Sequence, residues 1–304
     1  MVAKKATDLF NFISWKEYQS RPEMNFSLLK EMASGADVFK YRKAHPKEQT
    51  AAMLEGAVIH KRALEPDQFG SEYTIWEGGK TQAGKFSMSK ATTAYKEFES
   101  AEEAKGRTVI DAALVEKAAA IRDRIMQHPI ASTYLKNALV EQTVLWKNHG
   151  VDMKSRLDIV QPGFICDLKT ARDIDPWGFG KAAGDMLYHA QMALYRDAWA
   201  AKTGEVLPVK VLAVEKTEPF RICCYMINEE TLTEGQGLYE NWLKQLVKCR
   251  ETGKYPGLYE AEEEFRLPGY MLSQSMESEA NDTVAIGGKK MRLNEETGLL
   301  EEIE

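Results

Sequence analysis

The fold of this chain is decided by two short stretches, Ser155–Asp158 (SRLD) and Asp167–Thr170 (DLKT), which flank the turn Gln161–Phe164 (QPGF). Both stretches lie in segments with the alternating pattern of β-strands. If the Pro-Gly pair is at the centre of the turn, counting back along the two strands places Asp158 directly opposite Asp167. Directly opposed β-carbons lie roughly 4.5–5.5 Å apart, where two like charges are unfavourable unless a cation lies between them. The spacing therefore predicts a site for a hard divalent cation such as Mg²⁺ or Mn²⁺.

Lys169 extends this constellation, because it lies two residues after Asp167 and shares its face of the strand. Its ammonium can reach the site without binding the metal, and there it would orient or activate water. In phosphodiester hydrolysis a carboxylate-bound divalent ion lowers the pKa of water and neutralises charge on the phosphate. A nearby ammonium adds stabilisation of the transition state. Taken alone, a D-x-K strand is more often part of an ordinary salt-bridged hairpin, so the rest of the chain has to decide between the two interpretations.

Periodicity along the rest of the chain predicts a mixed sheet flanked by helices, of the α/β (α+β) class and with a helical N-terminal extension. Three consecutive strands are expected to be antiparallel, and a crossover helix then delivers a further strand, so that the central order is α-β-β-β-α-β. The predicted helices span 27–33, 49–64, 89–104, 112–127, 185–201 and 229–250, and the predicted strands span 73–76, 140–147, 153–160, 164–170, 207–214 and 221–227.

Charge is distributed unevenly between the body of the chain and its C-terminal segment. The 304 residues carry a net charge of −6, and an acidic balance of this kind argues against a nucleic-acid-binding protein. Residues 259–304, however, contain twelve acidic and four basic residues, a net charge of −8, which leaves residues 1–258 at +2. We therefore expect one domain over 1–258 and an acidic tail over 259–304. In that tail, 273–282 has the composition of a linker, and the last residues could form at most a small hairpin or helix.

The cysteines and the apolar runs indicate the compartment. None of the four cysteines has C-x-x-C spacing, and the adjacent pair Cys223 and Cys224 is poorly placed for a disulfide framework. No apolar run has the length of a signal peptide core or of a membrane span. The sequence thus predicts a cytoplasmic protein that does not associate with a membrane.

Four motifs in order give the body a resemblance to a known family. From about Asn25 to about Leu258 the chain resembles the RecE-type exonuclease domain, in the RecB-like branch of the PD-(D/E)XK nuclease superfamily. The motifs are a glycine-to-histidine helix (Gly56–Pro66), the first acidic strand (Ser155–Asp158), the D-x-K strand (Asp167–Thr170) and a Q-x-x-x-Y helix (Tyr188–Tyr195). Leu157 stands where many relatives have proline, and Asp167 where much of the superfamily has glutamate, but neither difference removes a ligand.

The resemblance implies a restriction-endonuclease-like core and a role for each motif residue. His60, Asp158, Asp167 and the carbonyl of Leu168 would hold Mg²⁺, for which Mn²⁺ could substitute, and Lys169 would help to activate water. In the last motif, Gln191 would contact the site or the DNA, and Tyr195 would position the helix or a phosphate. The i, i+4 spacing of Gln191 and Tyr195 is equally typical of a core-facing stripe, so Tyr195 could simply be a core residue.

Basic residues near the motifs are expected to contact DNA. The RecE-like group has a T-x-A-G-K stretch similar to residues 81–85, so Lys80, Thr81 and Lys85 are predicted on the DNA backbone, with solvated loop lysines as the alternative. Arg156, in the first acidic strand, is predicted to bind DNA as well.

The resemblance also implies an activity. It indicates magnesium-dependent degradation of linear double-stranded DNA from 5′ ends, which leaves a 3′ single strand for a RecT-like annealing protein, by an enzyme that forms a homo-oligomeric ring around DNA. Two alternatives stay open. One is a different PD-(D/E)XK nuclease, such as a structure-specific endonuclease, and the other is a DNA-binding recombination module without catalytic activity.

Overall fold

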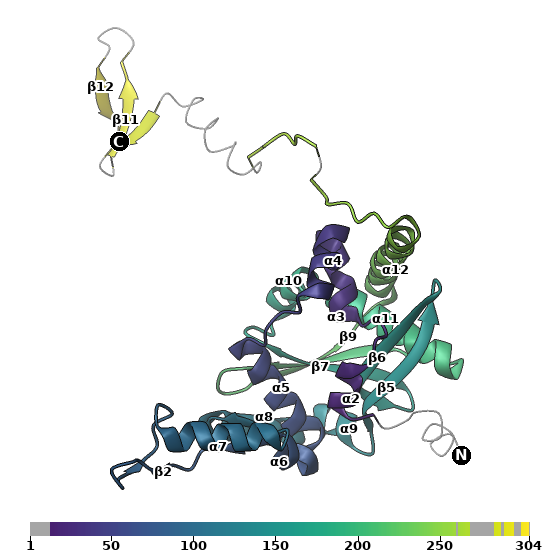
Figure 1. Cartoon of the computed structure of the whole chain (residues 1–304). Coiled ribbons are helices and arrows are strands. Elements are labelled where there is room, and N and C mark those ends of the chain that lie inside the picture. The colour runs from purple at the N-terminus through teal and green to yellow at the C-terminus, as the bar shows by residue number, and fades with distance from the viewer. Residues whose placement is uncertain (1–12, 260, 268–282, 287–288, 295–298, 304) are drawn as a thin grey trace. The chain divides into compact units, whose positions relative to one another are not determined.

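A computed structural model of the chain describes residues 13–259, 261–267, 283–286, 289–294 and 299–303. The chain divides into two compact units, Met1–Leu258 and Tyr259–Glu304. Figure 1 shows the first unit as a mixed body of strands and helices. Within the described part of the chain, no helix is both long and apolar enough to cross a lipid bilayer.

The first unit is built around a five-stranded sheet with the strand order β5-β6-β7-β8-β9. Its strands are β5 (Leu139–Asn148), β6 (Val151–Gln161), β7 (Phe164–Ala171), β8 (Val209–Glu215) and β9 (Ile222–Met226). The first three are antiparallel, β8 is parallel to β7, and β9 is antiparallel to β8. A parallel neighbour needs a crossover connection, and the helical segment between β7 and β8 supplies it. The predicted mixed sheet is therefore confirmed.

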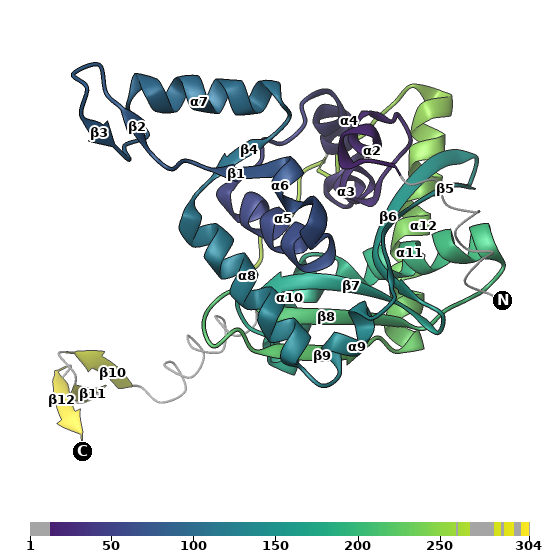
Figure 2. The ribbon, with the colours of Figure 1, turned by 90° about the horizontal axis from the view of Figure 1, so that it is seen from below.

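Helices cover both faces of this sheet (Figure 2). One core includes residues of α11 (Tyr188–Thr203) and α12 (Glu229–Thr252), and the other includes residues of α5 (Ala51–Leu64) and α8 (Ala112–Gln127). On β7, Ile165 contributes to the first core and Leu168 to the second. A strand buried on both faces has a nearly continuous apolar sequence, so Asp167 between them is an exception that calls for a functional reason.

Shorter elements complete the unit. They are α2 (Trp15–Ser20), α3 (Phe26–Leu29), η1 (Lys30–Ser34), α4 (Ala36–Ala44), η2 (Pro66–Gln68), α6 (Phe69–Glu72), β1 (Tyr73–Ile75), β2 (Gly79–Lys80), β3 (Phe86–Ser87), α7 (Thr93–Ala104), β4 (Thr108–Ile110), α9 (Ala131–Leu135) and α10 (Pro176–Asp185). The helix predicted over 185–201 does not begin at Asp185. Instead α10 ends there, and Leu187, with a left-handed φ of 60°, separates it from α11. A single left-handed residue changes the chain direction, and nothing in the apolar pattern of this segment reveals it.

The ladder between β5 and β6 is interrupted at one point. Val140 pairs with Ile159 and Gln142 with Leu157, but Glu141 and Asp158 between them form no ladder pair, and Glu141 has a φ of 52°. The alternation of β6 shifts at this point: Leu157 and Val160 pack in the first core, whereas Ile159 packs in the second. A non-glycine residue in the left-handed region costs roughly 1–2 kcal/mol, and such strain is concentrated at functional sites.

The second unit contains a three-stranded antiparallel sheet of β10 (Thr283–Ile286), β11 (Lys289–Leu293) and β12 (Leu300–Ile303). It exceeds the single hairpin or helix expected from the sequence. Opposite charges stabilise facing strands, and here Lys289 Nζ lies 2.7 Å from Glu302 Oε2 across β11 and β12. The predicted linker at 273–282 lies outside the described residues.

Candidate metal centre

The two acidic strands meet as the turn predicts. Gln161 pairs with Phe164, and the ladder continues to Ile159 and Cys166. The next step of the same register brings Asp158 next to Asp167, but the backbone ladder has ended there. Asp158 instead accepts a hydrogen bond of 2.8 Å at Oδ2 from the Leu168 backbone N–H. This bond fixes one carboxylate oxygen of β6 against β7.

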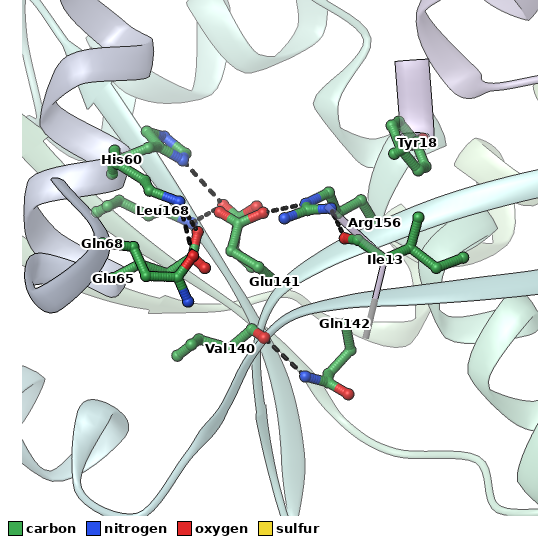
Figure 3. Close-up of polar contacts among 12 residues, drawn as sticks. Ile13, Tyr18, His60, Glu65, Gln68, Val140, Glu141, Gln142, Arg156 and Leu168 are labelled. Carbon is green, nitrogen blue, oxygen red and sulfur yellow. Dashed lines mark hydrogen bonds and ion pairs between the residues drawn. The ribbon is translucent and has the colours of Figure 1, made fainter. Parts of the chain in front are cut away.

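His60 and Glu141 join Asp158 in one cluster. His60 lies on α5, whose N-cap Thr50 accepts a hydrogen bond from the Met53 N–H, and its Nδ1 lies 3.5 Å from Asp158 Oδ2. One possible ligand atom each from His60, Glu141 and Asp158 all lie within 4.8 Å of one another. Figure 3 shows His60, Glu141 and the Leu168 backbone converging on one point. The predicted metal ligands His60 and Asp158 are thus brought together, with an additional carboxylate.

Glu141 was not predicted as a site residue. A signal was present in the turn between β5 and β6, where His149 and Gly150 have φ values of 46° and 75° and form a tight connection. Two-residue hairpin loops of this kind fix the register of their strands. Counting back from Asn148, which pairs with Val151, places Glu141 opposite Asp158. Three carboxylates on neighbouring strands could thus have been aligned by using both turns instead of one.

The charges of this cluster are unfavourable without a cation. Burial raises the pKa of the Asp158 carboxyl well above its usual value, and the negative charges of Asp167 and Glu141 raise it further. Burial also raises the pKa of Glu141. Although 26% of the His60 side chain is exposed, burial lowers its pKa to about 4, so the imidazole is neutral at pH 7 and its contact with Asp158 is not an ion pair. Neutral imidazole and carboxylate oxygens are metal ligands, and predominantly oxygen ligands suit Mg²⁺ or Mn²⁺.

Asp167 and Lys169 form the other half of the site, together with α11. Lys169 Nζ lies 2.7 Å from Asp167 Oδ2 and donates a hydrogen bond of 2.9 Å to Gln191 Oε1. Gln191 Nε2 in turn donates to the Tyr195 hydroxyl at 2.9 Å. Burial lowers the pKa of Lys169, but the charges of Asp167 and Asp158 outweigh it and the net shift is upward. The predicted residues of the D-x-K strand and of the Q-x-x-x-Y helix are thus joined in one chain of contacts.

Tyr195 combines the two interpretations that the sequence left open. Its side chain is only 9% exposed and belongs to the core between the sheet and α11. Its hydroxyl still reaches the site through Gln191.

Arg156 differs from its prediction as a DNA contact. Arg156 is only 7% exposed. Its Nε lies 2.5 Å from Glu141 Oε2, and one Nη donates a hydrogen bond of 3.0 Å to the Ile13 carbonyl. Figure 3 shows Arg156 on the far side of Glu141 from His60. Arg156 forms a regular ladder pair with Thr143, but Ile13 and Trp15 cover it, so the guanidinium lies inside the protein, where it neutralises Glu141.

The remaining predicted DNA contacts lie elsewhere. Lys80 and Lys85 are exposed on the β2–β3 hairpin, which projects from the body together with α7 in Figures 1 and 2. Thr81 closes this hairpin, because its Oγ1 accepts a hydrogen bond of 3.2 Å from the Lys85 N–H. The structure does not bring these three residues to the metal centre.

Comparison with known proteins identifies the family. Residues 25–268 match the model of a family described as a PDDEXK-like domain of unknown function (DUF3799). The chain belongs to this family. Its body is therefore a PDDEXK-like domain, and the resemblance seen in the four motifs is confirmed at the level of this superfamily. A search of the curated proteins finds no match.

One solved structure shares the fold. The crystal structure of a candidate exonuclease from Eubacterium rectale is 16% identical and covers 87% of this chain and 98% of its own, with a TM-score of 0.56. An alkaline exonuclease from Laribacter hongkongensis is 13% identical and covers 55% of this chain and 90% of its own, with a TM-score of 0.24. At such identities the first likeness shows a common fold.

Proposed function

We propose that this protein is a metal-dependent exonuclease that degrades linear double-stranded DNA from 5′ ends and leaves 3′ single strands for strand annealing. The observation that carries the proposal is the convergence of Asp158, Asp167 and Lys169, on the interior strands β6 and β7, with His60 of α5 and Gln191 of α11. The description of the Eubacterium rectale structure as a candidate exonuclease supports end-dependent cleavage over other nuclease activities.

His60, Glu141, Asp158, Asp167 and the carbonyl of Leu168 are the groups that would hold the metal, with Mg²⁺ as the expected ion and Mn²⁺ as a substitute. A bound divalent ion supplies Lewis-acid chemistry, which lowers the pKa of water and neutralises charge on a phosphate. Asp158 fits such an ion, because the negative charges of Asp167 and Glu141 lie close to it and raise its pKa, whereas Arg156 and Lys169 pair with Glu141 and Asp167. No lysine or arginine in the described part of the chain forms an ion pair with Asp158, and its neighbour His60 is neutral at pH 7.

The chain's own residues define the remaining steps. The charges of Asp167 and Asp158 raise the pKa of Lys169, so the side chain is protonated at neutral pH in the metal-free protein. It acts as a hydrogen-bond donor and a fixed positive charge, which orients the attacking water and stabilises charge that develops on the phosphate. Gln191 holds the ammonium from its other side and Tyr195 holds Gln191. Both are positioning residues that keep the donor in place without reorganisation.

The decisive experiment incubates the protein and its Asp167→Ala variant with linear and covalently closed duplex DNA, in Mg²⁺, Mn²⁺ or EDTA. We expect digestion of linear DNA only, only with metal and only by the wild type. Cleavage of closed circles would instead favour the structure-specific endonuclease, and the absence of any metal-dependent digestion would favour the DNA-binding module. Labelling the 5′ end and then the 3′ end of the linear DNA determines the direction of digestion.

Partners follow from the same proposal. A RecT-like annealing protein is the expected consumer of the 3′ single strand, and a homo-oligomeric ring is the expected assembly, which sedimentation analysis tests directly. Lys80, Thr81 and Lys85 are proposed contacts to the DNA backbone. Each lost phosphate contact lowers the slope of log Kd against log salt by about 0.9, so a Lys80→Ala/Lys85→Ala variant should lower it by about 1.8.

A further inference from the structure

A cavity of about 400 Å³ lies next to the metal centre and has two unlike sides. His60, Glu141 and Asp158 line one side, and the aromatic residues Trp15 and Tyr18 of α2 line another. This volume lies within the roughly 300–1,000 Å³ typical of small-ligand sites. The metal accounts for the acidic side only, so the aromatic side needs its own explanation.

The aromatic side is a supported platform. Trp15 stacks on Tyr18 with ring centroids 5.5 Å apart and planes inclined by 15°. Tyr18 is 7% exposed, whereas Trp15 is 46% exposed. A large exposed aromatic ring backed by a buried one has the form of the stacking surfaces that bind unpaired bases.

This platform is held against the sheet at both ends of α2. Lys154 Nζ donates hydrogen bonds of 2.7 and 2.6 Å to the carbonyls of Tyr18 and Arg21. Arg156 donates to the Ile13 carbonyl, and its guanidinium carbon lies 5.6 Å from the Trp15 ring centroid. Because Arg156 also pairs with Glu141, a single side chain links Trp15 to the carboxylate cluster.

The charges of the lining residues determine which part of a nucleotide the cavity can bind. Among the residues that line it, Lys61 is paired with Glu65 at 2.9 Å and with Glu72 at 2.6 Å, and Arg156 is paired with Glu141. Among the described lining residues, no cation is therefore left for a phosphate. A phosphate can be bound at the metal, and the uncharged base suits the aromatic side.

We propose that this cavity binds one unpaired base of the strand being cleaved, stacked on Trp15, while the adjoining phosphate lies at the carboxylates. The inference rests on the proposed function, because it assumes that DNA is the substrate. Stacking on an aromatic side chain tolerates every base, since every base has a π-face. A duplex then has to open by at least one nucleotide at its end, which a covalently closed molecule cannot do in the same way.

Binding of single-stranded DNA tests this assignment without turnover. Fluorescence anisotropy compares labelled hexathymidylate with an abasic hexamer of the same backbone, in Ca²⁺, a hard cation that occupies carboxylate sites, with a gel to verify that the DNA stays intact. We expect the wild type to prefer the base-bearing strand by about 5- to 150-fold, the span of about 1–3 kcal/mol for one stacked base. Trp15→Ala should bind both strands equally, and Trp15→Phe should retain most of the preference.

Trp177→Ala is the matched control, because Trp177 is 79% exposed and does not line the cavity. It should behave as the wild type. A full preference in Trp15→Ala, or equal binding of both strands by the wild type, would overturn the assignment. A protein that prefers the base-bearing strand but digests no DNA in Mg²⁺ would refute the nuclease proposal and leave the base site standing. A protein that digests DNA in Mg²⁺ but binds both strands equally would refute the base site and leave the nuclease proposal standing.

Discussion

The two halves of the candidate centre differ in how their charges are balanced. In the half formed by His60, Glu141 and Asp158, Arg156 pairs with Glu141, whose backbone is strained, but the half-buried Asp158 faces only a neutral imidazole. In the half formed by Asp167 and Lys169, a buried carboxylate has a cation at 2.7 Å, which Gln191 holds in turn. The first half is incomplete without a metal, and the second is preorganised without one. Removal of the Asp158 charge should therefore stabilise the metal-free protein, whereas removal of the Lys169 charge should destabilise it.

The largest effect on activity is expected for Asp158→Asn. Loss of a metal-binding carboxylate should lower kcat/KM on linear DNA by on the order of 10³-fold, the equivalent of about 4 kcal/mol. In EDTA the same variant should be more stable than the wild type, because repulsion with Glu141 and Asp167 is relieved. An increase in Tm of about 2–4 °C per kcal/mol of relieved repulsion is expected by calorimetry.

Asp152→Asn is the control for that variant, since Asp152 lies on the same strand with 69% of its side chain exposed. It should change neither activity nor Tm. If Asp158→Asn lowered the Tm of the metal-free protein, the contrast between the two halves would be refuted.

Lys169→Met should lower both activity and stability. Loss of one preorganised donor typically costs about 10²–10³-fold in kcat. Asp167, which is 2% exposed, would lose its cation, and breaking a buried pair in this way costs about 3–5 kcal/mol. Urea unfolding in EDTA measures this loss. Lys181→Met, at an exposed pair with Asp185, should leave both quantities unchanged, and a Lys169→Met protein as stable as the wild type would contradict preorganisation of this half.

Gln191→Ala should have a smaller effect, through Lys169. Loss of a residue that only orients a catalytic group typically costs about 10–100-fold. We expect the loss in kcat with KM unchanged, and little further loss when Gln191→Ala is combined with Lys169→Met, because the two residues act as one unit. Tyr195→Phe removes only the last hydroxyl of the chain and should cost less. Independent, multiplicative losses from Gln191 and Lys169 would show that Gln191 acts on the DNA instead.

Some features of the fold and of the candidate site could be predicted from the sequence, and others could not. The strands of the mixed sheet followed from apolar alternation, and the approach of Asp158 to Asp167 followed from the Pro-Gly turn, because both are local rules that propagate along a strand. The burial of Arg156 did not follow, because the residues that cover it, Ile13 and Trp15, are distant in the sequence. The start of α11 did not follow either, because the left-handed Leu187 separates it from α10. The burial of a polar side chain and the strained backbone of a single residue depend on tertiary contacts, which the apolar pattern does not encode.

The smallest expected effect is the pH dependence of metal stabilisation. The pKa values of Glu141 and Asp158 are raised in the folded protein, so above the ordinary carboxylate pKa of about 4 the folded state binds more protons than the unfolded state. Stability from these groups is then present at low pH and is lost as the pH rises through their raised values. Mg²⁺ replaces the missing protons. The increase in Tm on adding Mg²⁺ should therefore be greater at pH 8 than at pH 5.5. In a Glu141→Gln variant, the increases in Tm at the two pH values should be closer to each other. An equal increase at both pH values would show that these two carboxylates do not bind the ion.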